Sequence, residues 1–152
     1  MDLSQIKSII EKYNSDESLI LAMLQDVQRE YNYLPMEAME IIADELGVGL
    51  AKVASIATFY SSFSLKPRGK HIVTVCMGTA CHVRGAPRVL SELERELEVS
   101  DGDTTSDGIF TIETVNCVGA CALGPLVIVD GNYHGNITTS DVSGLIEEYK
   151  NK

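Results

Sequence analysis

The part of the sequence that decides the fold begins at residue 71, where residues 71–81 read HIVTVCMGTAC. The first six of these residues are rich in β-branched side chains and predict a strand that ends at Cys76. Residues 109–121 read IFTIETVNCVGAC and show the same pattern, a predicted strand over 109–115 followed by two cysteines. Each strand therefore leads at its C-terminal end into a loop that holds two cysteines: Cys76 and Cys81, then Cys117 and Cys121. If the two strands are neighbours in one sheet, the loops meet at one edge and four thiols converge.

The remaining elements of the second half alternate between the two types of secondary structure. A helix is predicted over residues 85–98, a polar loop over 100–108 and a third strand over 126–129, followed by a turn at Asp130. Thr138 and its neighbours are suited to cap a last helix that ends near Tyr149. The predicted order is β, α, β, β, α, which is typical of an α/β unit.

The first half of the chain shows only helical periodicity. Apolar residues recur at helical spacing in four stretches up to residue 60, with Pro35 placed to start the third helix and Gly47 to end it. The pattern changes near Pro67. We therefore predict an α+β protein with a helical bundle over residues 1–66 and an α/β domain over residues 67–152.

Composition and charge narrow the range of functions. The chain has 152 residues and a formal net charge of −10, so nucleic acid and anionic membrane surfaces are unfavourable partners. The first five residues lack the basic and apolar regions of a signal peptide, and there is no apolar run of the length that spans a membrane. These features predict a cytoplasmic protein without direct membrane insertion. Cysteines there usually stay reduced and serve metal binding or catalysis.

The spacing of the cysteines restricts their chemistry. They form one C-x4-C pair and one C-x3-C pair, which supply the four thiolates that a [2Fe–2S] cluster needs. Structural zinc also takes four cysteines and stays open on spacing alone. Two disulfides do not suit a reducing compartment, and a thioredoxin-type C-x-x-C is absent from the sequence. The loops between the ligands, residues 77–80 and 118–120, are small and uncharged, so backbone N–H groups can approach the cluster.

Other polar residues near the cysteines are less informative. His82 directly follows a predicted ligand, and we expect an outer or surface role for it. We expect His71 and His134 to be solvated. Arg84 and Arg88 either flank the metal centre or cover a helix face, and the sequence does not decide between these positions.

Residues 75–86 and 107–121 resemble the 24-kDa-type subunit of NADH:quinone oxidoreductase. The same family provides the small subunit of NAD-linked [FeFe]-hydrogenases and formate dehydrogenases. The resemblance extends from about residue 19 to residue 149 and is specific, because several motifs outside the two segments match as well. These motifs are Leu34-Pro35, Ala57-Thr58-Phe59-Tyr60, Pro67-x-Gly69-Lys70 and Gly124-Pro125.

The resemblance implies a helical N-terminal part followed by a thioredoxin-like ferredoxin domain. It implies one [2Fe–2S] cluster bound by Cys76, Cys81, Cys117 and Cys121 as the iron ligands, with no catalytic residue on this chain. FMN and NAD(H) are expected on a larger flavoprotein partner, to which the helical part helps dock. Further iron–sulfur subunits are expected in the same oxidoreductase complex, be it an NADH dehydrogenase, a hydrogenase or a formate dehydrogenase.

The resemblance also bears on location and assembly. The missing N-terminal extension suits a bacterial or archaeal source, with any membrane association made through the complex. The sequence leaves open whether the chain also forms a homodimer.

Two other functions are compatible with the sequence. One is a free thioredoxin-like [2Fe–2S] ferredoxin that shuttles between enzymes, and the other is a structural zinc module. A shuttle would not need the helical first half, whose apolar stripes favour a packing or docking role.

Overall fold

The computed structural model describes residues 3–152 and divides the chain into two compact units, Met1–Pro67 and Arg68–Lys152. Met1 and Asp2, which entered the prediction that there is no signal peptide, lie outside the described residues. Within the described range, no helix combines the length and the apolar character that crossing a membrane requires.

The first unit consists of helices, as predicted. They are α1 (Leu3–Lys12), α2 (Ile20–Tyr31), α3 (Met36–Leu46) and α4 (Leu50–Phe59), with a short 3-10 turn, η1 (Glu17–Leu19), before α2. Pro35 and Gly47 flank α3 as expected, and Gly47 adopts the left-handed conformation, with φ 64°, that ends many helices. The helices share one apolar core, formed by Ile6, Ile10, Ile20, Met23, Leu24, Val27, Leu34, Ala38, Met39, Ile42, Ala43, Val53 and Ala57.

The second unit is built on a four-stranded sheet. Its strands are β1 (His71–Cys76), β2 (Phe110–Val115), β3 (Leu126–Val129) and β4 (Asn132–Gly135), in the spatial order β2-β1-β3-β4. β1 and β2 are parallel, whereas β3 is antiparallel to both β1 and β4. The helices of this unit are α5 (Thr79–Val83), α6 (Ala86–Leu97) and α7 (Val142–Lys150), with short 3-10 turns η2 (Cys121–Leu123) and η3 (Thr139–Asp141).

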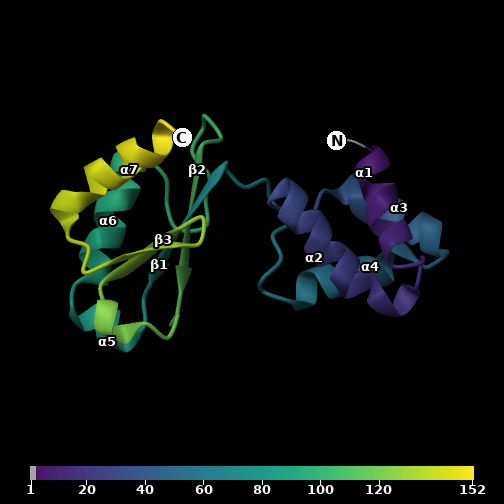
Figure 1. Ribbon diagram of the computed structural model, residues 1–152, viewed down its shortest axis with the longest axis horizontal. Coiled ribbons are helices and arrows are strands. Elements are labelled where there is room, and N and C mark those ends of the chain that lie inside the picture. The colour runs from purple at the N-terminus through teal and green to yellow at the C-terminus, as the bar shows by residue number, and fades with distance from the viewer. Residues whose placement is uncertain (1–2) are drawn as a thin grey trace. The chain divides into compact units, whose positions relative to one another are not determined.

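Helices α6 and α7 lie side by side on one face of the sheet (Figure 1). Along β1, buried residues alternate with half-buried ones until Cys76, as expected for a sheet with one well-covered face. The buried core of this unit includes Cys76 and Cys81, each only 2% exposed. Two of the four cysteines are thus part of the packed interior.

Two short elements were not predicted. α5 has five residues, too few for a periodic apolar pattern, and β4 is an exposed and mostly polar edge strand. The turn between β3 and β4 places Asp130 at φ 50° and Gly131 at φ 82°. An Asp-Gly pair with positive φ is typical of a tight hairpin, so the turn predicted at Asp130 leads into a further strand.

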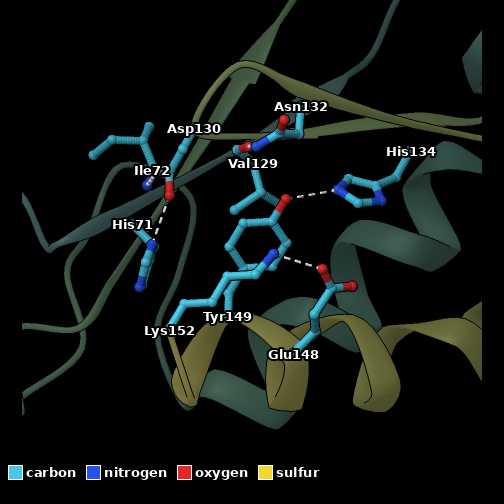
Figure 2. A network of polar contacts seen from close by, with 9 residues as sticks. All are labelled: His71, Ile72, Val129, Asp130, Asn132, His134, Glu148, Tyr149 and Lys152. Carbon is cyan, nitrogen blue, oxygen red and sulfur yellow. Dashed lines mark hydrogen bonds and ion pairs between the residues drawn. The ribbon is translucent and has the colours of Figure 1, made fainter.

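The prediction that His71 and His134 are solvated is wrong. His71 is 5% exposed, and its Nδ1 lies 2.6 Å from Oδ2 of Asp130, whose other oxygen accepts the Ile72 N–H (Figure 2). His134 is half-buried, with Nε2 3.0 Å from the hydroxyl of Tyr149. The Tyr149 ring also packs edge-on against His71, so both histidines help to fix α7 to the sheet.

Candidate metal centre

Parallel pairing of β1 and β2 brings the two cysteine-containing loops together. Cys76 is the last residue of β1 and is in register with Val115, the last residue of β2. Cys117 follows two residues later. The strands are therefore neighbours, as the prediction required, and both loops leave the sheet at the same edge.

The second cysteine of each pair lies in a short helical turn. Cys81 is in the middle of α5, and Cys121 is the first residue of η2. Both turns lie at the end of the sheet where β1 and β2 finish (Figure 1). Each of these two thiols is therefore carried by a short helical turn.

The thiols interact with one another and with backbone donors. Burial tends to raise the pKa of Cys76, but the N–H groups of Gly78 and Val118 and the thiols of Cys81 and Cys117 lower that pKa below its ordinary value. The Cys117 sulfur accepts a hydrogen bond from the Gly119 N–H at 3.3 Å. N–H groups of both small loops thus donate to cysteine sulfurs, while their approach to a bound cluster stays a prediction.

Cys81 lies in a different electrostatic environment. Burial raises its pKa, and the hydrogen bond and charge of Cys76 and the charge of Cys121 raise it further. The Leu126 N–H acts in the opposite direction, as a donor to the sulfur. The interactions therefore run from Cys117 through Cys76 and Cys81 to Cys121, so all four predicted ligands belong to one group.

The group is buried on one side and open on the other. Cys76 and Cys81 are buried, whereas Cys117 and Cys121 are exposed and line a surface pocket. The side chain of Val83, 80% exposed, forms part of the same pocket.

Two glycines allow the ligand segments to approach closely. A Cβ atom on Gly78 would lie 2.5 Å from the carbonyl oxygen of Asn116, and one on Gly124 would lie 3.0 Å from the Cys81 sulfur. Gly124 precedes Pro125 in a cis peptide bond. An added Cβ on Gly78 would overlap the Asn116 carbonyl oxygen, whereas one on Gly124 would make a tight contact that requires its neighbours to shift by a few tenths of an ångström.

The structure decides the roles that the sequence left open for the basic residues. Nη1 of Arg84 donates to the carbonyl oxygen of Cys121 at 2.9 Å, so Arg84 flanks the centre, while Arg88 is exposed on α6. His82 is exposed, in agreement with the surface role expected for it.

Four thiolates are the donor set that a [2Fe–2S] cluster takes, with two for each iron. The negative charge of the cluster would be met by the N–H donors that already point at the sulfurs.

A model of the family described as thioredoxin-like [2Fe-2S] ferredoxin matches residues 6–150. The chain belongs to this family. The predicted thioredoxin-like ferredoxin fold and the predicted [2Fe–2S] cofactor are thereby confirmed. The assignment of the four cysteines as its ligands stays a prediction, supported by the geometry above.

Several known proteins are similar over almost the whole chain. The NADP-reducing hydrogenase subunit HndA of Solidesulfovibrio fructosivorans is 39% identical over 145 residues, which span 95% of this chain and 85% of that protein. An NADH-quinone oxidoreductase subunit of Rhizobium meliloti is 34% identical, with 96% of this chain and 87% of that protein covered. An NADH-quinone oxidoreductase subunit of Escherichia coli K12 is 32% identical, with 95% and 87% covered.

A solved structure shares the fold. The crystal structure of an NAD+-reducing [NiFe]-hydrogenase in the H2-reduced state matches with a TM-score of 0.75 and 18% identity. The match covers 88% of this chain but only 22% of the hydrogenase chain. The likeness shows that the fold of this family occurs as part of a longer polypeptide.

Proposed function

We propose that this chain is an electron-transfer subunit of an NAD(H)-linked oxidoreductase complex and carries one [2Fe–2S] cluster on Cys76, Cys81, Cys117 and Cys121. The observation that carries the proposal is the meeting of the two cysteine pairs at one edge of the sheet. Relatives that cover at least 95% of the chain are named as subunits of a hydrogenase and of NADH-quinone oxidoreductases, which supports the wider assignment.

A bound cluster would accept and release single electrons, and the chain would supply its environment. The buried pair, Cys76 and Cys81, anchors the cluster to the core of the second unit. The exposed pair, Cys117 and Cys121, leaves one side open to a partner. The chain itself is non-catalytic in this proposal, and hydride transfer takes place at FMN and NAD(H) on a larger flavoprotein, with further iron–sulfur subunits beyond it.

The helical unit supports a docking role. Phe59 is 80% exposed and Met36 is 54% exposed, and Tyr60 packs edge-on against Phe59 at the end of α4. Exposed aromatic and methionine side chains are enriched in protein interfaces. We propose that this unit contacts the flavoprotein. We further propose a cytoplasmic location for the complex, since thiolate ligands of a cluster require cysteines that are not paired in disulfides.

The first test is the iron, zinc and acid-labile sulfide content of anaerobically purified protein, with EPR after reduction. Two irons and two sulfides per chain with a signal from the reduced state are expected. One zinc without sulfide would refute the proposal and favour a structural zinc module.

A second test separates a complex subunit from a free ferredoxin shuttle. The tagged chain is isolated anaerobically from its own cells, and the co-purified flavin and NADH-oxidising activity are measured. We expect both with the wild type and a strong loss of both with Phe59→Ser, while Tyr133→Ser, an equally drastic change at a 58% exposed residue of β4, serves as the control. A wild-type chain that carries its cluster but brings no flavoprotein would favour the shuttle.

A further inference from the structure

One arginine of the first ligand segment holds the backbone of the second. Arg84 follows α5 directly, three residues after Cys81, and its side chain is exposed. Its Nη1 donates to the carbonyl oxygens of Cys121 at 2.9 Å, Ala122 at 3.3 Å and Gly124 at 3.4 Å. A single guanidinium group thus binds three carbonyls around the fourth predicted ligand.

These carbonyls need a donor because η2 is only one turn long. The last carbonyls of a helical turn have no partner within it, and basic side chains can supply one. In η2, the Asn136 N–H donates to the Leu123 oxygen at 2.7 Å, and the Gly124 N–H reaches the Cys121 oxygen at 3.3 Å. Arg84 donates to the Ala122 and Gly124 oxygens. It also donates to the Cys121 oxygen, over a shorter distance than the Gly124 N–H does.

The contact closes a ring of interactions around the site. Arg84 is joined through the chain to Cys81, and through its guanidinium to Gly124. Gly124 in turn packs tightly against the Cys81 sulfur, which would lie 3.0 Å from a Cβ added at this glycine. Loss of the guanidinium would therefore loosen the segment that carries Cys121 and covers Cys81.

The charge of Arg84 is also placed unusually for this protein. The chain has a formal net charge of −10, yet neither residues 76–91 nor residues 116–129 contain a carboxylate. Arg84 and Arg88 are the formally charged side chains of these two segments. The guanidinium of Arg84 places a positive charge on the Cys121 segment, in the pocket that Cys117 and Cys121 also line.

We propose that Arg84 is a positioning residue of this centre, which holds the Cys121 segment in place and raises the reduction potential of the bound cluster. The inference rests on the proposed function, since the charge can act only on a cluster that is present. Reduction adds one negative charge, and a nearby cation favours the more negative state.

The charge is tested on the full chain with the variants Arg84→Gln, Arg84→Lys and Arg88→Gln. Arg88→Gln is the matched control, because it removes the same charge from an exposed side chain that has no hydrogen bond to residues 116–129 within the described structure. The readout is the midpoint potential from an EPR-monitored redox titration. For Arg84→Gln we expect the ratio of reduced to oxidised cluster at the wild-type midpoint to fall about tenfold, which is about 59 mV for one electron.

In Arg84→Lys the potential should return close to that of the wild type, because the charge is kept. A wild-type potential in Arg84→Gln, or an equal shift in Arg88→Gln, would overturn the electrostatic role.

Positioning is tested by the rate at which a chelator removes iron. We expect several-fold faster release from Arg84→Gln and a smaller acceleration in Arg84→Lys, with Arg88→Gln unchanged. A wild-type rate in Arg84→Gln would overturn this role, and if that variant does not fold, a wild-type rate in Arg84→Lys would do so. Wild-type protein without iron and sulfide would instead refute the proposed function, so the two failures are distinguishable.

Discussion

Replacement of Gly78 by alanine tests the close approach of the two ligand segments. Gly78 has φ −58° and ψ 155°, which any residue can adopt, so backbone strain does not contribute. The cost arises from contact alone. The added Cβ would lie 2.5 Å from the Asn116 carbonyl oxygen and 3.3 Å from the Cys117 Cβ.

The size of the effect follows from these distances. Ordinary van der Waals contact begins at 3.4 Å, so the segments must separate by 0.9 Å. Such a shift of backbone in a packed site costs about 1–3 kcal/mol. With a urea dependence of about 1–2 kcal/mol/M, a loss of 2 kcal/mol lowers the unfolding midpoint by about 1–2 M. It also moves the Gly78 N–H away from the Cys76 sulfur.

The assay is urea unfolding of the cluster-free chain under reducing conditions, followed by iron and sulfide analysis of the anaerobic protein. Gly144→Ala is the matched control, because Gly144 lies in α7 with no atom within 4 Å of an added Cβ. The control should be more stable than the wild type by about 0.5–1 kcal/mol, since alanine favours helix. An unchanged midpoint together with full cluster content in Gly78→Ala would refute the close approach.

Three further outcomes are expected. Cys117→Ser should lose most of its iron and sulfide, because the number of thiolate ligands falls, and wild-type content would contradict the ligand assignment. His82→Ala should keep the cluster and at most shift its potential, so loss of the EPR signal would show that this histidine is a ligand. The Lys12 hydrogen bond lowers the pKa of Asp26 despite burial, so Asp26→Asn should reduce the unfolding free energy by about 1–2 kcal/mol at neutral pH. The difference in unfolding free energy between the wild type and Asp26→Asn should persist at pH values above the ordinary aspartate pKa of about 3.9 and shrink as the pH falls below it. A difference in urea midpoint that does not depend on pH would contradict the role of the carboxylate.

The arrangement around Cys76 and Cys117 could be predicted from the sequence because it depends on local signals. β-branched runs mark the strands, and each cysteine stands at or just after a strand end. Once the strands are parallel neighbours, the meeting of the loops follows from geometry. The same holds for α3, whose ends are marked by Pro35 and Gly47.

The features that the sequence did not reveal depend on contacts between distant residues. Burial of His71 requires Asp130, which lies 59 residues further along the chain, and the ring of Tyr149. Arg84 meets carbonyls that are 37–40 residues away, and its position three residues after Cys81 does not predict these contacts. A periodic pattern cannot report such pairings.

The unequal exposure of the four cysteines determines which of them are oxidised first in air. Oxidants and alkylating reagents reach Cys117 and Cys121 from solvent, whereas Cys76 and Cys81 are shielded by the packed interior. The solvent-exposed side of the site therefore also determines where oxidative damage begins. A chain that has lost its cluster should be oxidised first at the exposed pair. As long as that oxidation is still reversible, these two thiols must be reduced again before all four cysteines can take up a new cluster.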